Sequence, residues 1–290
     1  MIEYTFLPAA IALLLGLVLG WAPLPLHPVW SARLAATTAV TAALATAGTL
    51  LFVTVNYAAT LFPDAADRLP EWTLFGDDTP VPAPLGVPAT VLTVLVALVV
   101  VRSAVRWTRE VRTAREFSRS VLDTDLPIAV AIPGRHGGVL VSRGLLKVLD
   151  AGELQVVFRH ELAHLRHRHH RYLAAGSLAA AVVPLLRPLD RRLRFATERW
   201  ADEEAAEAVG DRALVARTIA KVALARPTSP APLPSFTDSV VVQRVAALLA
   251  TPPRKNPVSG PVILAGSGLT TGALAAAAFQ LDHALASTFL

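Results

Sequence analysis

The sequence of 290 residues contains no cysteine. This absence excludes disulfide bonds, thiolate zinc sites and cysteine nucleophiles, and it leaves histidine and carboxylate side chains as the candidate metal ligands. Charged residues are also scarce, at 17% of the chain, whereas 53% of the residues are hydrophobic and the mean hydropathy is +0.50. An ordinary soluble domain carries more charge than this. The composition therefore predicts an integral membrane protein.

Lysine is rare as well, since it occurs at positions 147, 221 and 255 alone, and arginine supplies most of a formal net charge of +5. A basic total can indicate nucleic-acid binding, but the arginines here flank apolar stretches, where they act as topology signals. We therefore expect no direct contact with nucleic acid. The lipid bilayer is the expected surrounding.

Long apolar stretches are the clearest pattern in the chain. A helix needs about 20 apolar residues to cross the hydrocarbon core of a bilayer. Four stretches qualify, at about residues 4–26, 34–61, 85–101 and 257–281. The first lacks the basic start and the small-residue cleavage site of a removable signal peptide, so we expect it to remain as a span.

A row of arginines follows the third stretch and sets the expected orientation. Basic segments stay in the cytoplasm, so this end should be cytoplasmic and the N-terminus outside. The prediction is a multi-pass protein of the bacterial inner membrane type. It has an N-terminal membrane domain (1–105), a cytoplasmic domain (106–256) and a C-terminal span (257–290). The arginines are spaced mostly by three or four, as on a continuing helix: Arg102, Arg106, Arg109, Arg112, Arg115 and Arg119.

The predicted cytoplasmic domain combines a small β-hairpin with helices. Short apolar runs at 127–133 and 139–142 surround three glycines and are typical of a hairpin. Ser142 can cap a short helix, and Asp150 can cap a longer one that carries the histidines. Helices are also expected at 194–209 and 211–225. The fold class is thus mainly α, with about four transmembrane helices and an α+β domain between the third and fourth.

The chemistry is predicted by the segment His160-Glu161-Leu162-Ala163-His164. On a helix, residues four apart lie on one face, so both imidazoles can bind the same metal ion. Glu161 would project beside that ion and take a proton from a bound water. Zinc lowers the pKa of such a water toward about 7. The pattern therefore predicts one Zn²⁺ per chain and hydrolysis of a polarised carbonyl, with Glu161 as the catalytic base.

A hydrolytic zinc site needs a third protein ligand and one open position. We choose Glu198, because Asp202 lies four residues later on the same predicted helix. Asp202 would face the site and hydrogen-bond the second nitrogen of a ligating histidine. His167, seven residues beyond His160, is a candidate substrate contact or oxyanion donor, or else part of an exposed helix end near lipid headgroups. Three carboxylates compete with Glu198 as ligands: Glu203, Glu204 and Glu207.

These residues resemble the membrane gluzincins, and within them the BlaR/MecR-type antirepressor metallopeptidases. The resemblance rests on residues 160–164, on Glu198 with Asp202, and on segment 139–149. It implies a zincin-like cytoplasmic domain, zinc held by His160, His164 and Glu198, Glu161 as general base and Asp202 behind the ligands. It also implies that an edge strand at Val139, Leu140 and Val141 contacts the substrate backbone by β-augmentation.

The chain departs from that pattern at two points. It ends at Leu290 without the extracellular penicillin-sensor domain of the β-lactam receptors. The related HtpX/Ste24-type proteases share the ligand pattern but have membrane helices between the second histidine and the glutamate. Here residues 172–186 are apolar for only about 15 residues and are interrupted by Pro184. One complete crossing would separate Glu198 from His164, so we expect a re-entrant, interfacial or core helix.

The predicted function is a zinc-dependent endopeptidase that cleaves a protein or peptide substrate, such as a repressor, at the cytoplasmic face in regulated proteolysis or signalling. Two alternatives stay open. One is a quality-control protease of the HtpX/Ste24 type. The other is a non-catalytic signalling protein whose zinc only stabilises the cytoplasmic domain, which would require a closed coordination sphere.

Overall fold

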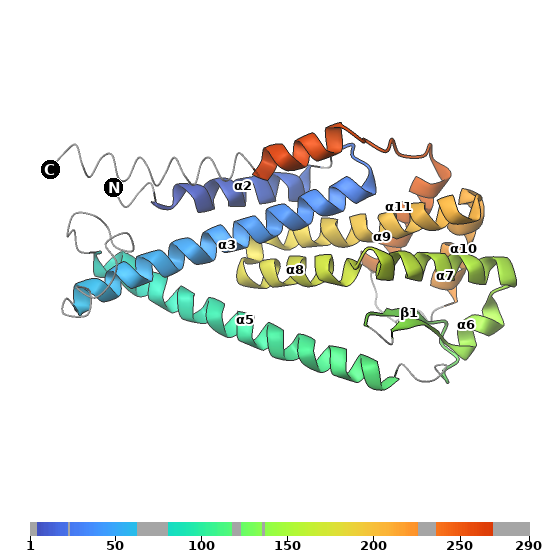
Figure 1. The fold of residues 1–290 in the computed structure, drawn as a ribbon, viewed down its shortest axis with the longest axis horizontal. Helices are drawn as coiled ribbons and strands as arrows, with labels where there is room; N and C mark the ends of the chain where they lie inside the picture. Colours follow the sequence, from blue (N-terminus) through green and yellow to red (C-terminus); the bar gives the residue numbers. More distant parts are fainter. Residues whose placement is uncertain are drawn as a thin grey trace.

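The computed structural model describes residues 5–22, 24–62, 81–117, 123–134, 137–225 and 236–268, and it is mostly helical (Figure 1). One antiparallel pair of strands is present in this part of the chain: β1 (Ala129–Ile132) and β2 (Gly138–Val141). The helices are α2 (Leu7–Trp21), α3 (Pro28–Leu61), α5 (Ala83–Phe117), α6 (Arg143–Val148), α7 (Ala151–Arg166), α8 (His169–Val182), α9 (Arg187–Val209), α10 (Arg212–Leu224) and α11 (Phe236–Leu249), with a 3-10 turn η2 (Pro184–Leu186).

Helices α3 and α5 pack against each other and are long and apolar enough to cross a membrane. The Thr54 and Thr93 hydroxyls meet at 2.9 Å between them, so each helix covers a polar group of the other. Helix α5 continues without a break from its apolar half into the arginine row, as the spacing of the arginines predicts. Its leucine and valine side chains are exposed, which is typical of a lipid-facing helix.

The four-span topology is not confirmed. Helix α2 has 15 residues, and at 1.5 Å per residue it reaches about 22 Å, less than the roughly 30 Å of a bilayer core. Of the fourth predicted span, residues 257 and 258 form a turn, residues 259–268 are helical, and residues 269–281 lie outside the described residues. The mainly helical class with a small hairpin is confirmed, whereas the number of crossings stays a prediction.

Helices α8 and α9 form a hairpin that packs along α2 and α3 (Figure 1). Their shared core is built largely from alanine and leucine, including Ala35 and Ala39 of α3 and Leu189 and Leu193 of α9. The turn η2 lies beside α2, where a Cβ on Gly16 would come within 2.7 Å of Leu186. Segment 172–186 therefore forms most of α8 and the turn η2, and one side of it packs into this core. With 14 residues, α8 is too short for a complete crossing.

A second core joins α7, α9, α10 and α11 at the end of the molecule that carries the hairpin β1–β2. Val156, Ala205 and Val215 are buried there, so α7 is held against α9 and α10. Helix α9 belongs to both cores and connects the apolar helices with the end of the molecule that carries the histidines. The domain boundaries at 105/106 and 256/257 stay a prediction.

Candidate metal centre

Helix α7 presents the first two ligand candidates. Its N-terminus is fixed by a capping box, in which Asp150 accepts a hydrogen bond from the Glu153 N–H at 2.8 Å and Glu153 accepts one from the Asp150 N–H at 3.0 Å. His160 and His164 then lie one turn apart on the face toward α9. Their Nε2 atoms are 3.2 Å apart, so the two rings converge as the spacing predicts.

Helix α9 brings the third candidate to the same point. Glu198 Oε2 lies 3.6 Å from His160 Nε2, and Glu198 Oε1 lies 3.6 Å from His164 Nε2. Tetrahedral zinc with bonds of about 2.0–2.1 Å places its donor atoms about 3.3 Å apart. The three side chains therefore fit one zinc ion. Their ligand atoms all lie within 4.8 Å of one another, which makes these three side chains the candidate metal-binding group among the described residues.

The carboxylates that compete with Glu198 in the sequence have other partners. Glu203 binds Arg199 and Arg212, Glu204 binds Arg166 and His167, and Glu207 lies 2.8 Å from Lys255. None of the three belongs to the cluster of ligand atoms among the described residues. Their place on the far side of α9 explains this, because they follow Glu198 by five, six and nine positions.

Asp202 lies behind His160, one turn along α9 from Glu198. It is fully buried, and its Oδ1 accepts a hydrogen bond from His160 Nδ1 at 3.0 Å. This contact holds the His160 proton on Nδ1 and turns the Nε2 lone pair toward the candidate metal position. The contact is the one that the four-residue spacing of Glu198 and Asp202 predicts.

Arg244 of α11 was not foreseen from the sequence. Its guanidinium binds Asp202 with two parallel hydrogen bonds, Nε to Oδ2 at 2.8 Å and Nη2 to Oδ1 at 2.6 Å. Its third nitrogen, Nη1, lies 2.9 Å from Glu198 Oε2. The side chain is only 13% exposed, so water screens its attraction to the two carboxylates weakly. Arg244 thus orients both carboxylates of α9 at once.

The charges of the centre balance one another. Burial disfavours a charged His160, but hydrogen bonds to Asp202 and Glu198 outweigh it and raise the pKa of His160 to about 10. Burial also opposes ionisation of the two carboxyls, yet their bonds to His160 and Arg244 hold both pKa values below the ordinary range. An imidazolium and a guanidinium therefore face two carboxylates. A divalent cation would displace the Nε2 proton of His160.

His164 has a different partner at its second nitrogen. Arg168 has the left-handed backbone conformation, with φ 54°, so the chain bends between α7 and α8 and returns His169 to the site. His169 is fully buried, and its Nδ1 lies 2.9 Å from His164 Nδ1. For His164 to offer Nε2 to a metal, its Nδ1–H must donate to His169, which then carries its proton on Nε2.

The ring of His169 lies in an apolar and aromatic environment. Its centroid is 4.7 Å from that of Trp200, and Tyr172 meets it edge to face. Its Nε2 is buried without a hydrogen-bond partner among the described residues. Burial, followed by the proximity of the His164 ring, with which a charged His169 would compete for protonation, lowers the pKa of His169 to about 3. Burial and the charge of His160 lower that of His164 to about 4. Both rings are therefore neutral, as a ligand and its support must be.

Glu161 lies on the opposite side of the centre, beside strand β1. It lines a cavity of about 490 Å³ that also contains His160, His164 and Glu198. Burial raises the pKa of its carboxyl, although His160 and a hydrogen bond from the Ala131 backbone act against this shift. A carboxyl whose pKa is raised above its ordinary value is better suited to receive and return a proton. The rest of the cavity wall is mostly apolar, with contributions from α10 and α11.

The strand that lines the cavity is β1, whereas the substrate contact was predicted on β2. The cavity is lined by Ala129, Val130 and Ala131, whereas the predicted contacts Val139, Leu140 and Val141 form the strand behind them. The N–H of Ser142 donates to the carbonyl of Ile128, so alternate residues of β1 pair with β2. Ala129 and Ala131 accordingly direct their backbone groups away from β2, toward Glu161.

The structure does not bring His167 to this cavity. Its Nε2 contacts Glu204, and its ring packs on Trp200 at 4.5 Å between centroids. It is the C-cap of α7, and the bend that begins there turns it toward α9. His170, three residues later, lines the cavity instead.

Two side chains that complete the centre were missed in the sequence. Arg244 could have been noticed, because it is the one charged residue in the apolar run from Val240 to Leu249, and an isolated charge on such a helix needs a partner. His169 offered no such signal. It is five residues from His164, which on a continuous helix would point elsewhere, and the left-handed Arg168 that changes this has no sequence signature.

Two histidines on one helix and a glutamate from a second helix could hold one metal ion, in an arrangement that resembles a gluzincin-type centre. Comparison with known proteins agrees with this class. Residues 100–186 match the sequence profile of Peptidase family M48. The match includes α7 and α8 and stops before Glu198.

Two curated relatives are similar to this chain over a short segment of its sequence. The protease HtpX homolog of Thermoplasma acidophilum is 39% identical over 70 residues, or 23% of this chain and 20% of that protein. The protease HtpX homolog of Acidiphilium cryptum is 38% identical over 69 residues, or 23% of this chain and 24% of that protein. The chain thus matches a quarter or less of the length of these relatives. No solved structure matches it significantly. Together these findings support a membrane zinc metallopeptidase, and they do not confirm the BlaR/MecR-type assignment.

Proposed function

We propose that the chain is a membrane-anchored, zinc-dependent endopeptidase. One observation carries the proposal: His160, His164 and Glu198 converge with the spacing of tetrahedral zinc, and Glu161 lies next to them at an open cavity. A structural zinc site has four protein ligands, whereas a hydrolytic one leaves a position free. The cavity supplies that free position.

The side chains divide the work of peptide hydrolysis. A zinc ion held by the three ligands would supply a Lewis acid and an acidified water. Glu161 takes a proton from the attacking water and returns it to the leaving amine, which its raised pKa favours. Asp202, held by Arg244, keeps the His160 lone pair directed at the ion.

Strand β1 is the proposed substrate guide. Backbone groups of Ala129 and Ala131 face the cavity, so an extended peptide can add to this edge as a further strand. The Ala131 N–H already hydrogen-bonds Glu161, which places the added strand within reach of the base. Backbone pairing tolerates many sequences, and the apolar wall of α10 and α11 favours substrates with apolar side chains next to the cleaved bond.

The proposed place of cleavage is the cytoplasmic face, in regulated proteolysis of a protein such as a repressor. The support is the row of arginines in the second half of α5, which follows a candidate span and precedes the hairpin β1–β2 in the chain. The signalling role is proposed because the predicted order of spans and cytoplasmic domain resembles that of the BlaR/MecR-type metallopeptidases.

A quality-control protease of the HtpX type is the second candidate. It is favoured by the similarity to two HtpX homologs. The two candidates share one chemistry and differ in the number of substrates. Comparison of cytoplasmic and membrane protein fragments between cells with the wild type and with Glu161→Gln separates them. One or two missing fragments favour regulation, and many missing membrane-protein fragments favour quality control.

The replacement Glu161→Gln tests the chemistry itself. Glutamine has the same shape but cannot accept a proton, so we expect bound zinc to be unchanged and peptide cleavage to fall by about 10²–10⁴-fold. Zinc is measured by elemental analysis of the purified full chain in detergent, and cleavage with an apolar fluorogenic peptide. Full activity in this variant would remove the assigned mechanism. A wild-type chain that binds zinc without cleaving any peptide would instead favour the non-catalytic alternative.

A further inference from the structure

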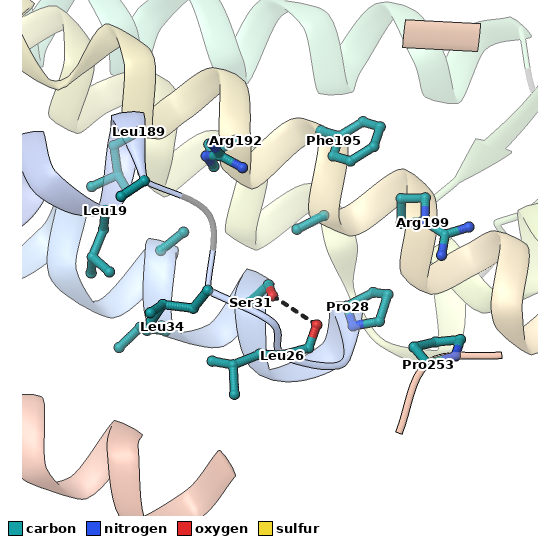
Figure 2. Close-up of a pocket in the computed structure, with 14 residues that line it drawn as sticks. Leu19, Leu26, Pro28, Ser31, Leu34, Leu189, Arg192, Phe195, Arg199 and Pro253 are labelled. Carbon is teal, nitrogen blue, oxygen red and sulfur yellow. Dashed lines mark hydrogen bonds between the residues drawn. The ribbon is translucent and has the colours of Figure 1, made fainter. Parts of the chain in front are cut away.

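A second cavity lies away from the metal centre, between α9 and the turn that joins α2 to α3 (Figure 2). Its volume is about 210 Å³. Figure 2 shows Leu19, Leu34 and Leu189 at one end, and Arg199 with Pro28 and Pro253 at the other. Arg192 and Ser31 lie between the two ends. The cavity is therefore amphipathic along its length.

The polar end holds an arginine that its neighbours do not satisfy. Arg199 is 8% exposed, and its Nη2 donates to Glu203 at 2.8 Å. Its Nη1 is buried and has no hydrogen-bond partner in the described part of the chain. A buried donor without a partner is rare in native proteins and calls for an explanation.

The charges around Arg199 leave a positive excess at the cavity. Glu203 is shared between Arg199 and Arg212, so one carboxylate serves two guanidinium groups. Arg192 adds another guanidinium, which donates to the backbone carbonyls of Gly20 at 3.3 Å and Trp21 at 3.2 Å. The partners of Arg192 are thus neutral carbonyls at the end of α2. This end of the cavity is therefore suited to a negatively charged ligand.

The apolar end is continuous with an exposed strip of α2. Leu14, Val18 and Trp21 are each half-exposed or more, and they follow one another at helical spacing up to the mouth of the cavity, where Leu24 is also exposed. A small soluble anion would leave these apolar side chains exposed to water. A hydrocarbon chain covers the strip, and the tryptophan at its end is typical of the level of lipid headgroups.

We infer that this cavity binds an anionic phospholipid, with the headgroup on the side lined by Arg192 and Arg199 and an acyl chain along Leu19 and the strip of α2. Basic pockets between apolar helices are suited to acidic headgroups. Guanidinium groups bind phosphate in a planar, bidentate manner. The inference is independent of the proposed peptidase activity, because it concerns binding at a separate cavity.

The test uses native mass spectrometry of the full chain, delipidated in a neutral detergent and titrated with phosphatidylglycerol or with phosphatidylcholine of the same acyl chains. We expect the wild type to retain phosphatidylglycerol preferentially. Arg192→Gln should weaken this binding by about fivefold, as expected for the loss of one arginine at a membrane surface. Ala22→Trp should weaken it too, because Ala22 is exposed at the cavity and a larger side chain fills it without a change of charge.

Arg187→Gln is the matched control. Arg187 is exposed on the same helix and does not line the cavity, so this variant has the same loss of charge and should bind as the wild type. Equal retention of both lipids overturns the inference, and so does an equal loss in Arg187→Gln. Inorganic phosphate is added in a third arm. Displacement of the lipid by millimolar phosphate would assign the cavity to a free anion and overturn the lipid assignment.

Discussion

The two histidines of α7 have different hydrogen-bond partners at Nδ1. His160 donates to a carboxylate, Asp202, which an arginine holds in place. His164 faces another imidazole, that of His169. A carboxylate makes its histidine a stronger ligand, whereas a neutral acceptor orients the ring without adding charge.

Replacement of His169 tests this supporting contact. His169→Leu removes the acceptor for His164 Nδ1–H and leaves that donor buried, so we expect zinc affinity to fall by about 10–100-fold. His169→Asn should recover most of the affinity, because its side-chain oxygen can take the place of the ring Nδ1. Affinity is measured by competition with a chromophoric chelator.

Circular dichroism of both His169 variants provides the control for folding. If the leucine variant retains helix content and binds zinc as tightly as the wild type, the supporting role of His169 is wrong. If both variants lose affinity equally, the ring is needed for packing against Trp200 and not as an acceptor.

Arg244 is the second residue whose removal has a defined consequence. Arg244→Met leaves Asp202 buried with one fewer partner and deprives Glu198 of its countercharge. Loss of one partner of a buried ion pair costs about 3–5 kcal/mol. We therefore expect the free energy of unfolding of the zinc-free chain to fall by about this amount, measured by denaturant titration in mixed micelles with tryptophan fluorescence.

Arg244→Lys is the matched variant for this experiment. Lysine keeps the charge but cannot form the planar fork to Asp202, so its stability should lie between those of the wild type and the methionine variant. Equal denaturation midpoints for all three proteins would show that the ion pairs of Arg244 contribute nothing to the fold.

At the scale of elements, the helices with local signals were predictable and their arrangement was not. Ser142 and Asp150 are caps whose spacing can be read from the sequence, and α6 and α7 begin where they predict. The convergence of His160, His164 and Glu198 was anticipated from helical spacing and from a family resemblance. The bend at Arg168 and the pairing of Asp202 with Arg244 depend on tertiary packing, which leaves no periodic pattern.

The contact between α2 and α9 can be tested with two glycines. A Cβ on Gly20 would lie 3.0 Å from the Leu189 backbone nitrogen and 3.1 Å from Pro188 Cβ, whereas a Cβ on Gly48 of α3 meets nothing within 4 Å. Gly20→Ala should therefore lower the free energy of unfolding by about 1–3 kcal/mol through overpacking. Gly48→Ala should raise it by about 0.5–1 kcal/mol, because alanine favours helix.

The pair of glycine variants contains its own control, since both make the same chemical change in an apolar helix. Thermal unfolding in detergent, followed by circular dichroism, gives the two shifts. Shifts of the same sign and size would mean that α2 and α9 do not pack as closely as described.

For the whole molecule, α9 is the element that unites the apolar helices with the metal centre. Its first half packs against α2 and α3, and its second half provides Glu198 and Asp202. The centre is therefore fixed with respect to the candidate spans and is not tethered by a linker. This arrangement suits cleavage close to a bilayer, whichever side it faces.

The proposed orientation can be measured directly because the chain has no cysteine of its own. Arg109→Cys lies in the exposed second half of α5 and should be protected from a membrane-impermeant maleimide in intact cells. Thr73→Cys lies between the second and third predicted spans and should react. Labelling after cell lysis is the control for accessibility. The opposite pattern in intact cells would place the metal centre outside the cytoplasm.

The position of Arg244 also bears on any shortened form of this protein. The three predicted ligands and the base all precede Ala225 in the sequence, so a fragment that ends there would still contain every predicted metal-binding residue. It would nevertheless lack the guanidinium that holds Asp202 and Glu198. Such a fragment would contain two acidic groups with a single imidazolium between them. We expect it to bind cations less selectively and to misplace the ligand on which hydrolysis depends.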